Sequence, residues 1–237
     1  MTTLRPRTER GHFCHPQLPY GKSELGAPLL YFPAQVSAGA SPPGIVMAGT
    51  HGDEVSAVVA LSCALRTLPA ERLCHHVILA VNPDGCQLGL RANAHGVDLN
   101  RNFATANWQA DGTVYRWNSA AEARDVRLST GSSAGSEAET RALTGLLERL
   151  KPHWVVTIHD PLACIEDPHD SALGRWLAER FQLPLVTDVG YATPGSFGTW
   201  CAERQLHCIT AEFPPISADA ASEDYLDALI DLLTWSD

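Results

Sequence analysis

Residues 44–49, Gly-Ile-Val-Met-Ala-Gly, form a continuous apolar run, and after Thr50 the chain continues as His51-Gly52-Asp53-Glu54. An apolar run without alternation predicts a strand that is covered on both faces of a sheet. Two residue types that bind metals, His51 and Glu54, then stand three positions apart, where the strand ends and a helix should begin. In an open α/β sheet, ligands bind at this end of the strands. The stretch therefore predicts an α/β fold with a site at the edge of its sheet.

Apolar runs alternate with segments of helical periodicity along the rest of the chain. We expect strands at 29–33, 44–49, 76–81, 154–159, 184–186 and 208–213, and helices at 54–68, 136–150, 171–181, 197–205 and 221–235. The helix at 136–150 opens with Ser-Glu-Ala-Glu, which fits a capping box at Ser136. Residues 85–135 contain no convincing long element, and such a stretch in a compact domain is usually functional or disordered.

The composition narrows the class of protein. With 237 residues, of which 45% are hydrophobic, the chain can bury one good core. Its net charge of -10 and pI of about 5.4 argue against a nucleic-acid partner. The chain has no apolar run long enough for a membrane span, and residues 1–10 lack the apolar stretch of a secretory signal. The seven scattered cysteines indicate free thiols in a reducing compartment, so we expect a cytoplasmic protein.

A third metal-ligand residue, His159, closes the apolar run at 154–158. Taken alone, His51 and Glu54 are also compatible with a chance match in which Glu54 interacts favourably with a helix dipole. A second strand that ends in a histidine favours a metal site, and two histidines with one glutamate bind catalytic zinc in one class of hydrolase. None of the cysteine spacings resembles a zinc knuckle, so we expect histidine and carboxylate ligands. Such sites keep a fourth position for water.

A zinc hydrolase also needs a general base, and Glu212 is the candidate. It lies near the end of the predicted strand 208–213, where a carboxylate is costly unless it is paired or faces a cleft. An exposed glutamate at a strand end is the alternative interpretation. Beside a zinc site, Glu212 would take a proton from water and later deliver it to the leaving amine.

The irregular stretch supplies cations. Arg91 precedes Ala92-Asn93, and Arg101 lies in Gly96-Val97-Asp98-Leu99-Asn100-Arg101-Asn102. Arginine side chains bind carboxylates through two parallel hydrogen bonds and stabilise a developing oxyanion. Both arginines are also compatible with ordinary surface charges.

Several motifs follow one another in order between about residues 20 and 215. They are His51-Gly52-Asp53-Glu54, Asn82-Pro83-Asp84-Gly85, residues 96–102, Ser136-Glu137-Ala138-Glu139-Thr140 and His159. Together they resemble the zinc carboxypeptidase family of the carboxypeptidase A type. The resemblance implies a single-domain three-layer α/β/α fold with a mixed, mostly parallel central sheet. The domain should cover residues 1–237, with an irregular N-terminal extension at 1–19.

The resemblance also assigns roles to the candidate residues. It implies one Zn²⁺ per chain, with His51, Glu54 and His159 as the metal ligands. Glu212 matches the general base of the family, and Arg91 matches the arginine that polarises the scissile carbonyl.

Further residues of the resemblance concern the substrate. Asn100 and Arg101 match the pair that holds the terminal carboxylate of the substrate. The compact length and residues 160–168 and 193–198 are most similar to a branch that recycles cell-wall peptides in the cytoplasm. The implied reaction is hydrolysis of the γ-D-glutamyl–diaminopimelate amide of free murein tripeptide, L-Ala-γ-D-Glu-meso-diaminopimelate.

The far end of diaminopimelate carries an amine and a carboxylate, so its pocket should contain an acidic partner and a basic or amide partner. Asp160, Glu166 and Asp167 are acidic candidates near the strand that ends at His159, and we expect Asp160 and Glu166 to bind substrate. Such residues are also common as capping carboxylates in loops. No tyrosine falls clearly at the point that matches the mobile tyrosine of digestive carboxypeptidases; Tyr191 is a possible match, but we do not include it among the catalytic residues.

Three alternatives to this interpretation concern other classes of protein. Residues 131–135, Gly-Ser-Ser-Ala-Gly, fit the G-x-S-x-G nucleophile pattern, but the segment before them is a poor buried strand. A zinc-dependent N-acyl amino acid deacylase of the aspartoacylase or succinylglutamate desuccinylase type shares the metal motif, although residues 96–102 argue against it. The third is a peptide-binding module without catalysis. In the leading interpretation the partner is a small murein peptide, with neither nucleic acid nor membrane, and the protein is a monomer or a homodimer.

Overall fold

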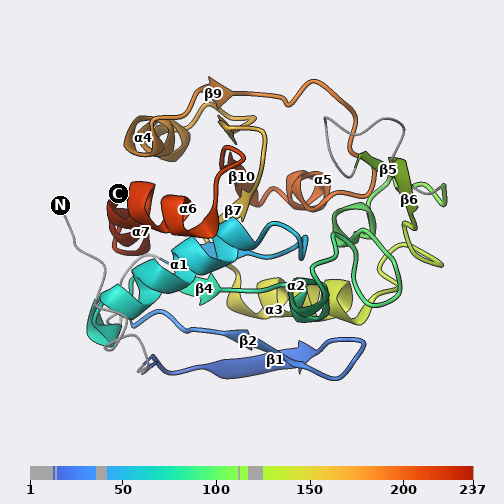
Figure 1. Cartoon of the computed structure of the whole chain (residues 1–237), viewed down its shortest axis with the longest axis horizontal. Coiled ribbons are helices and arrows are strands. Elements are labelled where there is room, and N and C mark those ends of the chain that lie inside the picture. Colours follow the sequence, from blue (N-terminus) through green and yellow to red (C-terminus); the bar gives the residue numbers. More distant parts are fainter. Residues whose placement is uncertain (1–12, 14, 36–41, 112, 117–124, 237) are drawn as a thin grey trace.

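A six-stranded sheet forms the centre of the computed structural model, which describes residues 13, 15–35, 42–111, 113–116 and 125–236 (Figure 1). Its strands, in spatial order, are β4 (His76–Ile78), β3 (Ile45–Ala48), β7 (Trp154–His159), β10 (His207–Glu212), β8 (Cys164–Glu166) and β9 (Leu185–Val186). The first four run parallel to one another, whereas β8 runs antiparallel to β10 and β9 runs parallel to β8. The mixed, mostly parallel sheet confirms the expected fold class.

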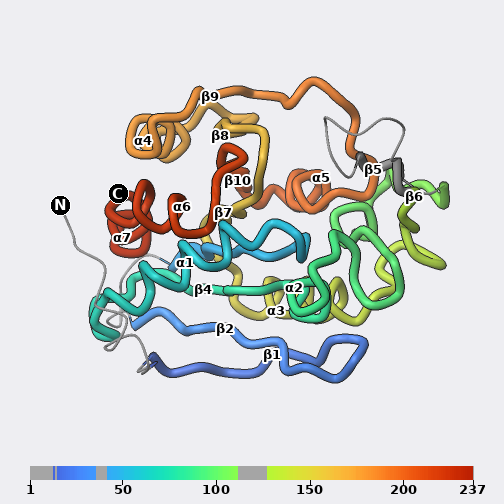
Figure 2. The backbone as a smooth tube through the Cα atoms, viewed as in Figure 1, coloured from blue at the N-terminus to red at the C-terminus, as the bar shows by residue number. Residues whose placement is uncertain are grey.

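Helices cover both faces of this sheet. The helices of the described residues are α1 (Val55–Thr67), α2 (Pro83–Leu88), α3 (Ala138–Leu150), α4 (Ala172–Phe181), α5 (Phe197–Glu203), α6 (Ala218–Asp224) and α7 (Leu226–Leu233), with short 3-10 turns η2 (Ala70–Arg72) and η3 (Leu99–Arg101). One core joins the sheet to α1, α4, α6 and α7, and the other joins it to α3 and α5. Figure 2 shows the hairpin of β1 (Leu18–Lys22) and β2 (Pro28–Tyr31) running alongside α3.

Alternate residues of the buried strands pack into the two different cores. Every residue of β3 and β7 is buried, as their unbroken apolar runs predict. In β7, Val156 and Ile158 belong to the core with α1, whereas Val155 belongs to the core with α3 and α5. Because side chains alternate along a strand, Thr157 and His159 lie on the same face as Val155. The polar end of β7 therefore continues the α3 and α5 side of the sheet.

The start of α3 shows that the capping-box prediction is wrong. The helix begins at Ala138, and its N-cap residue Glu137 makes no side-chain capping bond. Instead, Oε1 of Glu24 accepts the Ala138 N–H at 2.7 Å from a segment 114 positions away. The Ser136 hydroxyl donates to the Glu137 carboxylate rather than capping the helix. A remote carboxylate thus replaces the expected local cap.

The structure also differs from the predicted elements at one helix, one strand and the N-terminal extension. The single helix expected at 221–235 is broken at Tyr225 into α6 and α7, and the ring of Tyr225 stacks on Phe213 with centroids 4.3 Å apart. Strand β8 was not predicted. The expected N-terminal extension overlaps β1, which begins at Leu18, and residues 1–12 and 14 lie outside the described part.

The stretch 85–135 contains more regular structure than expected. It includes most of α2, the turn η3 and a hairpin of β5 (Thr113–Arg116) and β6 (Asp125–Leu128). Residues 112 and 117–124 lie outside the described residues.

The described cysteines agree with the expected free thiols, whereas Cys14 lies outside the described residues. Within the described residues the free cysteines are Cys63, Cys74, Cys86, Cys164, Cys201 and Cys208. The helices in the described part of the chain are all too short or too polar to traverse a lipid bilayer.

Candidate active site

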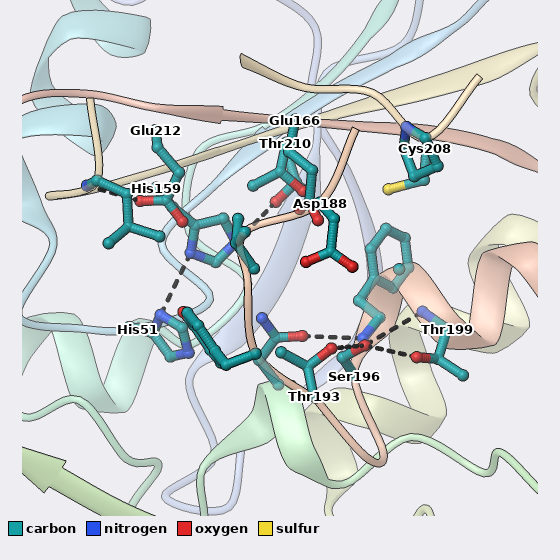
Figure 3. A pocket seen from close by; sticks show the side chains of 18 of the residues that line it. His51, His159, Glu166, Asp188, Thr193, Ser196, Thr199, Cys208, Thr210 and Glu212 are labelled. Carbon is teal, nitrogen blue, oxygen red and sulfur yellow. Dashed lines mark hydrogen bonds between the residues drawn. The ribbon is translucent and has the colours of Figure 1, made fainter. Parts of the chain in front are cut away.

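A cleft opens at the carboxyl ends of β3, β7 and β10 and has a volume of about 720 Å³ (Figure 3). It extends from the loop after β3 to the segment after β9. All residues expected to bind metal or substrate or to act in catalysis line it: His51, Glu54, Arg91, Asn100, Arg101, His159, Asp160, Glu166 and Glu212. The fold therefore brings together side chains that lie far apart in the sequence, from His51 to Glu212.

Three of these side chains converge on one point. Oε1 of Glu54 lies 2.6 Å from Nδ1 of His51, and Oε2 lies 2.8 Å from Nδ1 of His159. The two histidine Nδ1 atoms are 3.2 Å apart, and all three residues are buried. Two imidazole nitrogens and one carboxylate suit Zn²⁺. The ligand atoms lie close enough together to hold one metal ion.

The second nitrogen of each histidine is engaged by a neighbouring side chain. Nε2 of His51 lies 3.2 Å from Oδ1 of Asp98, and Nε2 of His159 lies 3.1 Å from Oγ1 of Thr157. Each ring can therefore donate its Nε2–H and keep the Nδ1 lone pair for a cation. Outer partners of this kind fix the orientation and tautomer of metal-binding histidines. The donor set thus fits a zinc ion.

The electrostatics of the pocket favour a positive charge. Burial and Arg91 act to lower the pKa of His51, but Glu54 and Asp98 outweigh them and raise it to about 9. Burial opposes the ionisation of Glu54 and Asp98, yet the neighbouring histidine charges hold both pKa values well below their usual range. The two carboxylates therefore remain ionised at neutral pH, as cation binding requires.

Close backbone packing positions the loop that carries His51. A Cβ atom at Gly52 would lie 2.0 Å from the carbonyl carbon of Gly85 in α2, so only glycine allows this approach. Helix α2 is capped by Asn82, whose Oδ1 accepts the Gly85 N–H at 2.9 Å. The Asn-Pro-Asp-Gly motif therefore supports the ligand loop from behind.

Strand β10 presents alternate residues to the cleft. Cys208, Thr210 and Glu212 line it, whereas Ile209 lies in the core on the opposite face. Glu212 is the direct neighbour of His159 across the ladder between β10 and β7. Burial raises the pKa of the Glu212 carboxyl. A raised pKa gives a carboxylate greater proton affinity, which suits a group that must accept and release a proton.

The motif at 96–102 anchors one wall of the cleft. Asn102 is completely buried, and its Oδ1 accepts the Glu137 N–H at 3.1 Å. Oδ1 of Asn100 accepts the Phe197 N–H at the start of α5 at 2.8 Å. This contact orients the Asn100 side chain and leaves its NH₂ group as a donor. Arg101 follows directly and also lines the cleft.

Arg91 lies against Glu54, one of the three candidate metal ligands, and against Asp98. Its Nη1 donates to Oε1 of Glu54 at 3.0 Å, and its Nε donates to Oδ2 of Asp98 at 3.4 Å. The side chain is only partly buried and lines the cleft. This position is compatible with contact to a substrate carbonyl next to the metal ligands.

The three acidic candidates near β7 have different surroundings. Oδ2 of Asp160 accepts the Ser56 hydroxyl at 2.6 Å, and burial raises the pKa of Asp160 to about 6. Asp167 is completely buried and accepts the Ser171 N–H at 2.7 Å, so it is a structural cap, as its alternative interpretation held. Glu166 lines the cleft from β8.

Sequence reasoning missed several residues of the cleft. Asp98 stands inside a recognised motif and could have been identified as an acidic partner for a histidine. Asp188 and Tyr191 follow the two-residue strand β9, where no periodicity marks a position. Tyr191 is 55% exposed, and its pKa is raised by partial burial and by Glu212. Tyr191 is therefore a residue of the cleft.

The G-x-S-x-G pattern lies away from the cleft. Ser133 is exposed, and its carbonyl accepts the Asn102 side-chain amide at 3.1 Å. Helix α3 begins only at Ala138, so the serine does not stand on a strand-to-helix elbow. The serine hydrolase alternative is wrong.

Comparisons with known proteins agree with this geometry. The family model described as zinc carboxypeptidase matches residues 17–173. Murein peptide amidase A of Escherichia coli K12 is 66% identical over 235 residues, covering 99% of this chain and 96% of that protein. The crystal structure of murein-tripeptide amidase from Escherichia coli O157 has a TM-score of 0.94 and 64% identity, covering 100% of this chain and 99% of that chain.

A more distant structure shares the fold. Carboxypeptidase A from Helicoverpa armigera has a TM-score of 0.69 and 18% identity, covering 93% of this chain and 67% of that chain. From the match of the family model and the identity to its relatives, the chain belongs to the zinc carboxypeptidase family and is a metallo-hydrolase.

Proposed function

We propose that this protein is a zinc-dependent amidase that hydrolyses the γ-D-glutamyl–diaminopimelate bond of free murein tripeptide and releases diaminopimelate for cell-wall peptide recycling. The observation that carries the proposal is the 66% identity, over 99% of the chain, to a protein named murein peptide amidase A. The cleft supports it, because one volume of about 720 Å³ contains a metal-ligand group, a base candidate and cations for a carboxylate.

His51, Glu54 and His159 would hold one zinc ion per chain through two Nδ1 atoms and a carboxylate. When bound, zinc supplies Lewis acidity, which polarises a carbonyl and makes a water molecule more acidic. Asp98 and Thr157 keep the two imidazoles in the tautomer that this role requires.

Glu212 is the proposed general base. Its carboxylate would accept a proton from the attacking water and deliver that proton to the nitrogen of the leaving diaminopimelate. The position of Glu212 beside His159 on the neighbouring strand supports this role.

Arg91, Asn100 and Arg101 are proposed to orient the substrate. The diaminopimelate residue carries a free carboxylate next to the scissile amide, which the NH₂ group of Asn100 and the guanidinium of Arg101 would bind. Arg91 would contact the scissile carbonyl oxygen and stabilise the negative charge that develops there.

The proposed partner is a small peptide, and the proposed location is the cytoplasm. The free thiols of the described cysteines support this location, because thiols persist in reducing compartments.

Mass-spectrometric analysis of products tests the proposal. The zinc-loaded protein should convert L-Ala-γ-D-Glu-meso-diaminopimelate into L-Ala-D-Glu and diaminopimelate, and it should cleave an ordinary α-linked peptide far more slowly. Equal cleavage of both peptides would overturn the proposed substrate. Faster release of acetate or succinate from acylated amino acids would instead favour the deacylase alternative.

A further inference from the structure

The cleft continues beyond the metal ligands to a second group of polar side chains. Glu166 on β8 lies directly opposite Thr210 on β10, and Thr210 in turn lies beside Thr157 on β7. Thr210 stands two residues before Glu212 on the same strand face. The pair formed by Thr210 and Glu166 therefore lies roughly 7 Å along the strand direction from the pair formed by Glu212 and His159.

A second carboxylate lies near Glu166. Asp188 stands two residues beyond Val186, which is the partner of Glu166 in the β8–β9 ladder. Figure 3 shows the Asp188 carboxylate directed into the pocket, which Glu166 and Cys208 also line. The negative charge of Asp188 contributes, after burial, to a raised pKa of Glu166. The two acids are therefore close enough to repel each other.

Neither acid has a cationic partner of its own in the described part of the chain. The contacts found there are the Thr210 side chain and the Val189 backbone for Glu166, and the Gly190 N–H for Asp188. Asp167, by contrast, has an imidazole partner, because its Oδ1 lies 3.0 Å from Nε2 of His207. Two neighbouring carboxylates that face a cleft gain stability from a cationic ligand, which relieves their repulsion.

The charges along the cleft are arranged in order. Arg91 contacts Glu54, and Arg101 helps to lower the pKa of Asp98, whereas Glu166 is the ladder partner of Thr210 and Asp188 follows the strand next to Glu166. This order matches a ligand with a carboxylate beside the scissile amide and an ammonium group at the end of its side chain. Diaminopimelate has this form, with three methylene groups between its two amino-acid ends.

We propose that Glu166 and Asp188 form an acidic subsite that binds the ammonium group at the far end of the substrate side chain. The inference rests on the proposed function, and it assigns selectivity, rather than catalysis, to these two residues. Glu166 contributes from the sheet and Asp188 from the loop after β9, so their carboxylates approach the ammonium group from two elements. Thr210 helps to orient Glu166.

Matched substrates separate the ammonium group from the rest of the side chain. In L-Ala-γ-D-Glu-X, X is meso-diaminopimelate, L-lysine, which keeps the ammonium group and lacks the far carboxylate, or L-2-aminopimelate, which keeps the carboxylate and lacks the ammonium group. For the wild-type protein, kcat/KM should be about 10- to 100-fold higher with diaminopimelate than with 2-aminopimelate, because charged hydrogen bonds are lost.

Variants then show which residues are responsible for the selectivity between these substrates. Glu166→Gln and Asp188→Asn should each bring this ratio towards one, mainly by raising KM for substrates that carry the ammonium group. The exposed Glu179→Gln on α4 is the matched control and should keep the wild-type ratio. Thermal unfolding of each variant shows whether it is folded. An unchanged ratio in both acidic variants, or its loss in Asp160→Asn instead, would overturn the proposal.

Binding of free amino acids tests the subsite without any turnover. Calorimetry on the zinc-loaded wild-type protein should show tighter binding of meso-diaminopimelate than of 2-aminopimelate, and Glu166→Gln should reduce that difference. Equal binding of both amino acids would contradict the subsite. A protein that discriminates between them but does not cleave the tripeptide would contradict the proposed function and leave the subsite supported.

Discussion

The two ends of the cleft hold their carboxylates in different ways. At the metal end, Glu54 and Asp98 are buried, and each contacts a histidine and Arg91. At the far end, Glu166 is half-buried and Asp188 is exposed, and neither forms an ion pair with another described residue. The metal end is thus arranged by the protein before any ligand binds, whereas the far end leaves negative charge for a ligand to neutralise.

This difference indicates a division of labour along one cleft. Prearranged charges act most strongly where bonds break, because they need no reorganisation during the reaction. Carboxylates without a cationic partner in the protein act best where a ligand must be recognised by its own charge. Changes at the metal end should therefore alter the rate for every substrate, and changes at the far end should alter the preference among substrates.

Removal of the metal should have the largest effect. Dialysis against a chelator should reduce hydrolysis of the tripeptide to background, and added zinc should restore it. Because a ligand that binds only the folded state stabilises that state, the melting temperature should also fall. Zinc content, activity and thermal unfolding measured on the same samples check this prediction. A metal-free protein with full activity would contradict the assignment of His51, Glu54 and His159.

Glu212→Gln should have the next largest effect. Loss of a general base lowers the rate by about 10²- to 10⁴-fold, and kcat should fall by that factor. The amide occupies a similar volume, and Glu212 is not in the ligand group, so zinc content should remain at one ion per chain. Steady-state kinetics and elemental analysis test both parts, and a variant that binds zinc and keeps the wild-type kcat would exclude Glu212 as the base.

Asp98→Asn should weaken the metal site by a smaller amount. The amide can still accept the His51 Nε2–H, but it lacks the charge that stabilises the cationic pocket. Loss of an outer partner costs about 10- to 100-fold in metal affinity or activity. Competition with a chelator of known affinity measures the change. Wild-type zinc affinity together with wild-type activity would show that this contact has no role in holding the metal.

Asn102→Ala should act mainly on stability and have the smallest effect on turnover. The substitution leaves the buried Glu137 N–H and the Thr130 carbonyl without their partner. We expect a loss of about 2–4 kcal/mol in the free energy of unfolding, because unsatisfied buried groups are costly. Urea denaturation measures it, with the exposed Ser132→Ala as control. A change no larger than that of the control would mean that Asn102 does not anchor the 96–102 motif.

That His51, His159 and Glu212 share one cleft could be predicted from the sequence, because these residues sit at the ends of recognisable strands. His51 follows one apolar run, and His159 closes another. Because the two strands are parallel, their carboxyl ends lie at the same edge of the sheet. Glu212 likewise ends a strand, β10, which is parallel to β7. The motif at 96–102 added Asn100 and Arg101, whose contacts with other elements appear only in the structure.

The far end could not be predicted because its geometry depends on pairing between distant segments. Strand β8 has three residues and β9 has two, which is too few for a periodic pattern. The sequence therefore predicts neither the antiparallel pairing of β8 with β10 nor the position of Asp188 in the cleft. The prediction of a local cap for α3 is wrong for the same reason. The Ala138 N–H donates to Glu24, which lies 114 positions away in the sequence. The break at Tyr225 reflects stacking on Phe213.

The most direct test of the division of labour compares selectivity in two variants. The ratio of kcat/KM for the diaminopimelate and 2-aminopimelate tripeptides is measured in the wild-type protein, in Glu212→Gln and in Glu166→Gln. The account predicts that Glu212→Gln slows both substrates by the same factor and leaves the ratio unchanged, whereas Glu166→Gln brings the ratio towards one. A Glu212→Gln variant with an altered ratio, or a Glu166→Gln variant that slows both substrates equally, would contradict it.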